Sequence, residues 1–456
     1  MQVLSDYYRL PDSSLSNFLP SVTPVVPGFF RFGSETICYG RSASGVSENV
    51  EGSTQFDASK IVRFQGAEVA LPFDPDEIID NLRREKYVAN LVPGRERILT
   101  KDWVLTAYYF VRGLLPVSIR RHLQKAYFSD WKKRPFPAWP VDFTVDTLHE
   151  DFLRLSMRAA GIERTPFIWF WPEGAPSCLI MTHDVETSAG RDFTSRLMDL
   201  DESYGFKASF QVIPEKRYKV SAEYVHEIQH RGFEFNIHDL KHDGHLYTNR
   251  EEFLRRAKRI NAYAREYNAR GFRAGAMYRI LDWYDSFEFS YDMSLSNVAH
   301  LEPKRGGCCT VFPFFIGKIL ELPLTTTQDY SLFHILNDYS IDLWKKQLDT
   351  ILHRNGLISF IAHPDYLISR RARKVYELLL DYLRQLIANQ KIWMALPGEV
   401  DQWWRARSQM SLVRNGDRWE IQGPQKEKAR VAFACLRDGR VVYEMSECYA
   451  KEGVRR

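Results

Sequence analysis

The sequence has few cysteines, and none of them stands in a metal-binding or redox spacing. The six cysteines of the 456-residue chain form no C-x-x-C pair, which excludes the zinc-finger and thioredoxin-type motifs that depend on that spacing. A chain of this length buries enough apolar surface to fold without disulfide bonds. We therefore expect reduced thiols, as in a cytosolic protein.

Long hydrophobic runs and an excess of charge of one sign are also missing. The most apolar stretch, 103–117, is interrupted by Arg112 and Pro116 and falls short of the roughly 18 apolar residues that span a bilayer. The first residues, MQVLSDYYRL, lack the basic and then apolar order of a secretory signal. Lys and Arg total 62 against 58 for Asp and Glu, a balance that does not indicate nucleic-acid binding. We expect a cytoplasmic protein.

Short apolar runs alternate with amphipathic segments between about 166 and 410. Several amphipathic segments end at a glycine, a signal of helix C-termini, and Thr248 and Glu251 have capping-box spacing at the start of another. The runs that we expect to be strands are 178–182, 208–213, 233–237, 272–277, 357–362 and 392–395. This alternation predicts an α/β fold with a parallel sheet, closed or nearly closed into a barrel.

The regions before residue 166 and after residue 410 do not show this alternation. Residues 1–165 combine short β-type runs with two helical stretches, 77–87 and 103–127. Beyond residue 410, Asn-Gly at 415–416 and Asp-Gly at 438–439 are strong hairpin signals. We predict three parts: an N-terminal mixed β and helical extension (1–165), a β/α barrel (166–410) and a small C-terminal β appendage (411–456).

Three polar clusters follow strands of the predicted barrel: THDVE at 182–186, HDLKHDGH at 238–245 and AHPDY at 362–366. Each cluster alone is more often a solvated strand end, a surface pair or a turn. Active sites of parallel β/α folds lie at the carboxyl ends of the strands. Three clusters at equivalent strand ends would converge there, and together they indicate a functional site.

The residue types in these clusters suit a mononuclear metal site. His238 and His242 are four residues apart, on adjacent turns if the backbone is helical. Two imidazoles and one carboxylate form a common catalytic Zn²⁺ set. Asp184 and Glu186 alternate along the strand end, and we expect both to point into the site only if the backbone turns after Asp184. One carboxylate would then bind the metal while the other accepts a proton from water. His363 is suited to protonate a leaving amine.

Region 178–396 resembles the polysaccharide deacetylase (NodB-like) family of carbohydrate esterases. The TFDDG motif of that family corresponds to residues 182–186, its H-[ST]-x-x-H motif to 238–242, its RxPY motif loosely to 273–278, and its final histidine to His363. The resemblance implies a distorted (β/α) barrel and a hydrolase of carbon-nitrogen bonds other than peptide bonds. Its expected reaction is removal of an acetyl group from an N-acetylated or O-acetylated saccharide, in bacterial surface-polysaccharide synthesis.

The resemblance also implies residue roles. Val185 replaces the second Asp of the motif and cannot bind a cation, so Glu186 becomes the expected carboxylate ligand. The family also has an Asp–Trp element between its RxPY motif and its final histidine. Two positions in this sequence could match that element, Asp282-Trp283 and Asp292, and chain order favours Asp292. His245 is expected to be a solvated loop residue. The predicted metal ligands, for a divalent ion that is most often Zn²⁺, are Glu186, His238 and His242. The predicted catalytic residues are Asp184, His363, Arg273 and Asp292.

Other interpretations stay open. A non-catalytic saccharide-binding protein on the same fold is favoured by Val185, and a hydrolase of a non-sugar amide is a second alternative. The saccharide could be polymeric or lipid-linked. Residues 111–135 hold seven Lys or Arg against one acid, interleaved with aromatic residues. We favour a solvated helix face there, and the alternative is a surface for an anionic lipid headgroup or acidic glycan at the inner membrane face.

Overall fold

The computed structural model of the protein describes residues 2–11, 18–19, 26–91 and 131–446. The predicted helix at 103–127 and most of the basic segment 111–135 lie outside the described residues.

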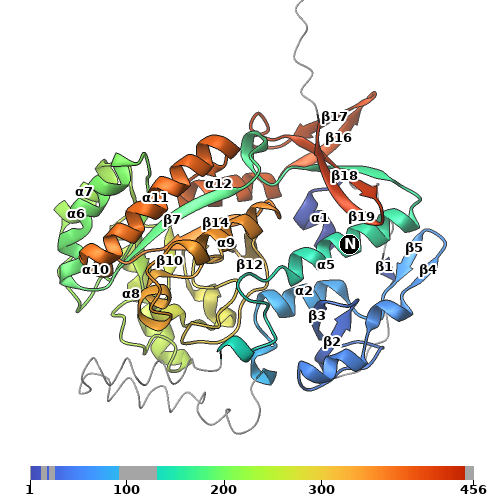
Figure 1. Ribbon diagram of the computed structural model, residues 1–456, viewed down its shortest axis with the longest axis horizontal. Helices are drawn as coiled ribbons and strands as arrows, with labels where there is room; N and C mark the ends of the chain where they lie inside the picture. Colours follow the sequence, from blue (N-terminus) through green and yellow to red (C-terminus); the bar gives the residue numbers. More distant parts are fainter. Residues whose placement is uncertain (1, 12–17, 20–25, 92–130, 447–456) are drawn as a thin grey trace, which may run out of the picture.

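The largest sheet in the described part of the chain is a curled sheet of nine strands (Figure 1). Its order is β12-β13-β11-β10-β9-β8-β7-β14, and β15 also pairs with β7. All pairs are parallel except β12 with β13. The strands are β7 (Cys178–Val185), β8 (Ser209–Val212), β9 (Glu234–His238), β10 (Gly271–Arg273), β11 (Tyr291–Asp292), β12 (Phe314–Ile316), β13 (Ile319–Glu321), β14 (Leu357–Ile361) and β15 (Trp393–Met394). The fold is a distorted (β/α) barrel, as the sequence predicts.

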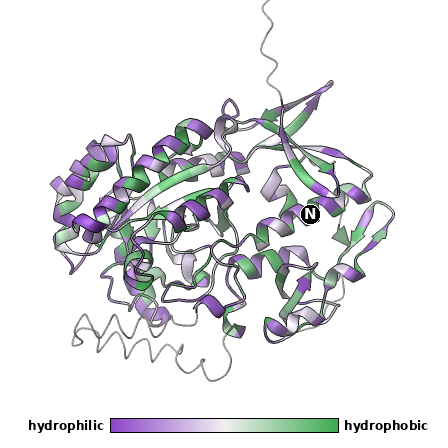
Figure 2. Ribbon diagram, in the orientation of Figure 1, coloured by the Kyte–Doolittle hydropathy of each residue, from purple (hydrophilic) through white to green (hydrophobic). Residues whose placement is uncertain are grey.

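Helices lie outside the sheet, with many of their hydrophilic residues facing away from it (Figures 1 and 2). They are α6 (Ser188–Ser203), α7 (Ala222–His230), α8 (Arg250–Glu266), α9 (Asp342–Leu352), α10 (Pro364–Leu367), α11 (Arg370–Gln390) and α12 (Pro397–Ser408). The predicted start of α8 is off by one residue. Asn249 is the N-cap, because its side chain accepts the backbone N–H of Glu252, while the Thr248 hydroxyl donates to the carbonyl of His245.

The barrel is closed irregularly between β13 and β14. The segment after β13 runs beside β14 and bonds to it mainly through threonine side chains. The Thr325 hydroxyl donates to the carbonyl of Leu357 at 2.8 Å and accepts the N–H of Ser359 at 2.9 Å. Thr326 donates to the carbonyl of Ser359 through both its hydroxyl and its N–H. This segment, not counted among the strands, holds the two edges of the curled sheet together.

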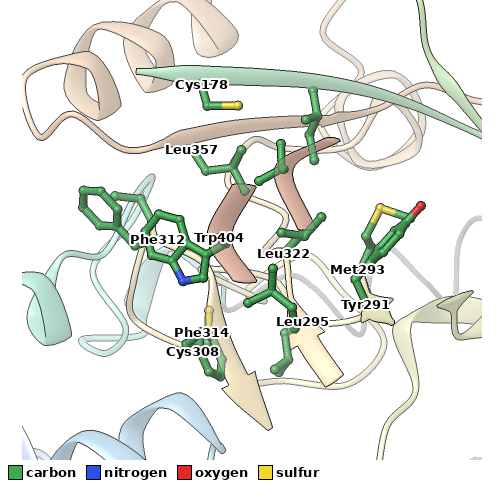
Figure 3. Close-up of a cluster of buried hydrophobic side chains, with 14 of the residues drawn as sticks. Cys178, Tyr291, Met293, Leu295, Cys308, Phe312, Phe314, Leu322, Leu357 and Trp404 are labelled. Atoms are coloured by element: carbon green, nitrogen blue, oxygen red, sulfur yellow. The ribbon is translucent and has the colours of Figure 1, made fainter. Parts of the chain in front are cut away.

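Apolar side chains fill the space between β7, β14 and the strands opposite them. Figure 3 shows a cluster in which Cys178 and Leu357 face Leu295, Leu322 and aromatic residues of the 312–314 segment. The labelled residues of this cluster are buried. Because the barrel interior is a packed core, polar chemistry is left to the strand ends.

The N-terminal extension shares a sheet with the second C-terminal hairpin, while the first hairpin forms a two-stranded sheet of its own. Strand β18 pairs with β6 on one side and β19 on the other, with Val431 opposite Ile168. The N-terminal elements are α1 (Gln2–Tyr8), β1 (Phe18–Leu19), β2 (Gly28–Phe32), β3 (Thr36–Gly40), β4 (Arg63–Gln65), β5 (Glu68–Ala70), α2 (Pro75–Arg83), α5 (Thr144–Ala159) and β6 (Arg164–Ile168). The C-terminal strands are β16 (Ser411–Asn415), β17 (Arg418–Gln422), β18 (Val431–Arg437) and β19 (Arg440–Met445). Both predicted hairpins are present, β16–β17 and β18–β19.

The composition led us to expect reduced cysteines and no membrane-spanning segment. The five described cysteines are buried and unpaired. Among the described helices, none combines the length and the apolar character that a membrane crossing requires.

Candidate metal centre

The end of β7 places two carboxylates on one side of the strand. Because side chains alternate along a strand, Asp184 and Glu186 face the centre of the barrel end, and Val185 is buried on the other side. His183 also points away: its Nδ1 lies 2.9 Å from the carbonyl of Ala362 and its Nε2 lies 3.0 Å from Asp201. In the THDVE segment, therefore, the histidine is a buried structural residue and the two acids belong to the site.

The backbone at Glu186 is held from two directions. The Glu186 N–H donates to Asp365 Oδ2 at 3.1 Å, and the Tyr218 hydroxyl donates to the carbonyl of Val185 at 2.5 Å. The Thr187 hydroxyl donates to the other oxygen of Asp365. Asp365 comes from the AHPDY segment, so this acid ties two of the three predicted clusters together.

The two predicted histidine ligands come from the end of β9 and the loop after it. The loop is not helical as the four-residue spacing suggested: Asp239 and His242 have φ values of 57° and 51°, in the left-handed region. This path folds the His242 ring back beside His238, with their centroids 4.9 Å apart. Gly275 permits the fold, because a Cβ there would lie 3.0 Å from Cδ2 of His242.

Glu186, His238 and His242 present one ligand atom each within 4.8 Å of one another. Glu186 Oε1 lies 3.0 Å from His242 Nε2 and 4.0 Å from His238 Nε2. Burial alone would raise the pKa of Glu186, but the neighbouring His242 and His238 hold that pKa well below its usual range.

These three side chains fit a divalent cation. His238 Nδ1 lies 3.1 Å from the carbonyl of Arg273, which fixes the proton on Nδ1 and leaves Nε2 as a lone-pair donor. Within the described residues, His238 Nε2 has no hydrogen-bond partner although it is buried. A lone pair facing a carboxylate is unfavourable unless a cation lies between them. Two imidazoles and a carboxylate are a preferred Zn²⁺ set.

Asp184 is held by a fully buried arginine. Arg273, at the end of β10, donates from Nη1 to Asp184 Oδ1 at 2.6 Å and to the Thr182 hydroxyl at 2.9 Å. Its Nε donates to the carbonyl of Met293 at 3.0 Å. Burial alone would raise the pKa of Asp184, but Arg273, with His238 beside it, keeps that pKa below its usual range. Arg273 therefore orients Asp184 and keeps it ionised.

His363 is oriented by an acid that the sequence analysis missed. Asp329 Oδ1 lies 2.6 Å from His363 Nδ1, and Asp329 Oδ2 accepts the backbone N–H of His363 at 2.7 Å. Burial would lower the pKa of His363, but Asp329 raises it to about 10. Asp329 ends the polar run TTTQD that follows an apolar stretch, the same kind of signal as in the three clusters that were recognised.

Three residues considered from the sequence are not brought to this centre. Asp292 accepts hydrogen bonds from the hydroxyls of Tyr284 at 3.0 Å and Ser294 at 2.7 Å, and it does not line the cavity described below. Asp282 is exposed and pairs with Arg84. The His245 ring lies beside the Thr248 hydroxyl at 3.5 Å and is outside the metal-binding set. The acid that lies beside His363 is Asp329, from the segment after β13.

Five of the predicted site residues open onto one cavity of about 100 Å³: Asp184, Glu186, His238, His242 and His363. Its remaining lining is mainly apolar and aromatic, with one further acid and one amide: Ala274, Ala276, Met277, Glu302, Pro303, Gln328, Tyr330 and Tyr366. The Tyr366 ring lies against the His363 ring, with centroids 4.9 Å apart. All three predicted clusters thus meet at one hollow, at the carboxyl ends of the strands.

The N-terminal extension supports one wall of this cavity. Glu85, just after α2, accepts hydrogen bonds from Nε and Nη2 of the fully buried Arg279 and from the N–H of Gly307. Arg279 Nη1 in turn donates to the carbonyl of Met277 at 2.6 Å. A residue far away in the sequence therefore fixes the backbone of a residue that lines the site.

No family model matches this chain, and no curated protein matches it. Among solved structures, a protein from Mycobacterium smegmatis named as a polysaccharide deacetylase is 16% identical with a TM-score of 0.43, over 55% of this chain and 98% of that one. PuuE allantoinase is 11% identical with a TM-score of 0.40, over 52% and 92%. The peptidoglycan deacetylase PdaC from Bacillus subtilis is 12% identical with a TM-score of 0.32, over 50% and 90%. Polysaccharide deacetylases are thus among the structural neighbours of this chain, and the assignment of its function rests on the geometry of the site.

Proposed function

We propose that this protein is a metal-dependent hydrolase that removes an acetyl group from an N-acetylated or O-acetylated saccharide. The observation that carries the proposal is that three groups of side chains meet at one cavity. These are a Glu-His-His set for a cation, an aspartate held ionised by a buried arginine, and a histidine held by a buried aspartate.

Glu186, His238 and His242 would hold the cation, most suitably Zn²⁺. When bound, such a cation polarises the acyl carbonyl and makes water more acidic. Asp184 accepts the proton of the attacking water, since its Oδ1 is committed to Arg273 and its Oδ2 lies toward the metal-binding set, 3.8 Å from His238 Nε2.

His363 donates a proton to the departing amine or alcohol. Asp329 holds the proton on Nδ1 and turns Nε2 toward the cavity, where it lies 3.8 Å from Glu186 Oε1. Asp184 and His363 thus approach the metal-binding set from different strands, β7 and β14, as a base for water and an acid for the leaving group require.

The rival interpretation, a non-catalytic saccharide-binding protein, depended on Val185. Glu186 supplies the carboxylate from the next position, 3.0 Å from His242, so Val185 does not argue against a metal site. We further propose a role in bacterial surface-polysaccharide synthesis in the cytoplasm, on a polymeric or lipid-linked saccharide. A membrane contact through 111–135 is the alternative to the solvated helix face that we favour there, and it rests on the basic composition of that segment. The pathway and the form of the saccharide rest on the resemblance in the sequence.

The test measures metal content and then acetate release. Purified protein should contain about one divalent ion per chain, and it should release acetate from at least one member of a panel of N-acetylated and O-acetylated saccharides. The double substitution His238→Ala, His242→Ala should abolish both. A matched control exists in α7, where His226 and His230 are also four residues apart, exposed and stacked at 5.3 Å. Their double alanine substitution should change neither property.

Full metal occupancy in the His238, His242 double variant would refute the metal site. Metal without acetate release from any saccharide, combined with saccharide binding, would favour the binding-protein alternative. Metal with hydrolysis of a non-sugar amide alone would favour the other hydrolase.

A further inference from the structure

One acid in the cavity wall has no part in the proposed chemistry. Glu302 is 4% exposed, and its Oε2 accepts a hydrogen bond from the Gln328 side-chain amide. Within the described residues, no hydrogen bond reaches the other carboxylate oxygen, Oε1. Oε1 is not among the fully buried polar atoms that lack a hydrogen-bond partner, and Glu302 lines the cavity. The free oxygen is therefore open to whatever enters the site.

The loop that carries Glu302 is anchored to the N-terminal extension through Glu85 and Tyr87. Gly307 donates its N–H to Glu85 at 2.7 Å, and its carbonyl accepts the Tyr87 hydroxyl at 2.6 Å. Gly306 has a φ of +130°, and a Cβ there would lie 2.5 Å from Glu85 Oε1. These contacts with the N-terminal extension hold the loop close. Glu302 is thus a fixed group of the cavity and not a mobile surface acid.

The surroundings of Glu302 define what it could bind. Burial raises its pKa, while Arg279 and His363 oppose that rise. A buried carboxylate with one unsatisfied oxygen is costly unless a hydrogen-bond donor completes it. Because the Gln328 amide nitrogen is engaged by Glu302, Gln328 has its amide oxygen left as a second acceptor. Two acceptors side by side suit a ligand that carries hydroxyl donors.

The rest of the wall suits a ring with apolar faces. Met277, Pro303, Tyr330 and Tyr366 line the same cavity. A saccharide combines C–H faces, which pack on apolar and aromatic side chains, with a rim of hydroxyl groups. A ligand carrying its own carboxylate would place a like charge near Glu302 and Asp184.

We infer that Glu302 and Gln328 form a hydroxyl-binding subsite that selects an uncharged acetamido sugar and excludes one that bears a carboxylate. This inference rests on the proposed function and names its substrate class. Glu302 accepts a hydroxyl of the ring that carries the acetyl group, and Gln328 supports Glu302 and accepts a second hydroxyl.

The experiment compares sugars that differ in charge and little else. The substrates are N-acetylglucosamine, 2-acetamido-2-deoxyglucuronic acid, and the C6 amide of that acid, which matches it in size without the charge. We expect the wild-type protein to hydrolyse the amide at least tenfold more efficiently, in kcat/KM, than the acid. Glu302→Gln should bring that ratio close to one and lower kcat/KM for N-acetylglucosamine roughly tenfold to a hundredfold, mainly through KM.

The matched control is Glu234→Gln. Glu234 is also a largely buried acid, bonded to Asn236 and to the N–H of Gly398, but it lies at the start of β9 and outside the cavity. The Glu234→Gln variant should keep the wild-type ratio of kcat/KM between the amide and the acid. Metal content and thermal unfolding of both variants report folding, and the comparison of acid with amide on the wild-type protein needs no variant.

A wild-type ratio near one, or an unchanged ratio in Glu302→Gln, would overturn the subsite. If the wild-type protein releases acetate from no saccharide, the proposed function has failed. The subsite is then judged by calorimetric binding of the same amide and acid. Tighter binding of the amide, lost in Glu302→Gln, supports the subsite, and equal binding or no binding of either sugar refutes it.

Discussion

Replacing Glu186 by Gln tests which of two neighbouring acids binds the metal. Glu186 Oε1 lies 3.0 Å and 4.0 Å from the two imidazole Nε2 atoms, and no arginine engages it among the described residues. Asp184 has its Oδ1 bound to Arg273 at 2.6 Å, and its Oδ2 lies 3.8 Å from His238 Nε2. We therefore propose that Glu186 binds the cation and that Asp184 accepts the proton.

The expected loss of metal affinity or of rate depends on the group that each substitution removes. Glu186→Gln keeps the shape of the side chain but removes the only carboxylate of the metal set, and we expect metal affinity to fall by at least tenfold, about 1.4 kcal/mol. Asp184→Asn removes the base but no ligand. It should retain the metal while the rate of acetate release falls on the order of 10²-fold or more.

Equilibrium dialysis against a zinc buffer, with metal measured in the protein, distinguishes the two. The reasoning is refuted if Asp184→Asn loses the metal and Glu186→Gln keeps it, since Glu186 would then be the base. The exposed pair His226 and His230 provides the control for adventitious binding: their removal should leave the dialysis curve unchanged.

Three other predictions concern groups that act on the site or the fold from a distance. Asp329→Asn removes the charge that orients His363, and the rate of acetate release should fall roughly tenfold to a thousandfold with metal content retained; a fall smaller than twofold would contradict the role. Glu85→Gln breaks the buried pair with Arg279 and should destabilise the protein by about 3 kcal/mol or more and raise KM, measured by urea unfolding and steady-state kinetics. Burial raises the pKa of Asp146 from 3.8 to about 7, so the folded state holds its proton more tightly than the unfolded state. Its contribution to stability is present below pH 4 and lost as the pH rises to 7, with an upper bound on the order of 4 kcal/mol. The difference in unfolding free energy between wild type and Asp146→Asn should shrink across that window, and a constant difference would refute the shift.

Local sequence patterns were sufficient to predict much of the barrel. The strands at 178–185, 234–238 and 357–361 follow from short apolar runs, and the two C-terminal hairpins follow from Asn-Gly and Asp-Gly turns, because each signal depends on a few adjacent residues. The turn after Asp184 that the sequence analysis made a condition is not required, because alternation along the strand by itself places Asp184 and Glu186 on one side.

Contacts between distant residues could be decided only by the tertiary structure. Asp292, predicted to be catalytic, is bonded to Tyr284 and Ser294 away from the cavity, whereas Asp329, which was not predicted, bonds to His363. The sequence does not tell how far Asp292 or Asp329 lies from His363 in the folded chain.

The paths of the loops could not be predicted from the sequence either. His242 reaches the metal set through left-handed backbone at Asp239 and His242, which ordinary residues rarely adopt and which packing against Gly275 allows here. The support of the cavity wall by Glu85 joins residues about 190 positions apart. Amino-acid types and their spacing thus determined which chemical groups were at hand, while the folding of separate loops onto one barrel end decided which of those groups meet.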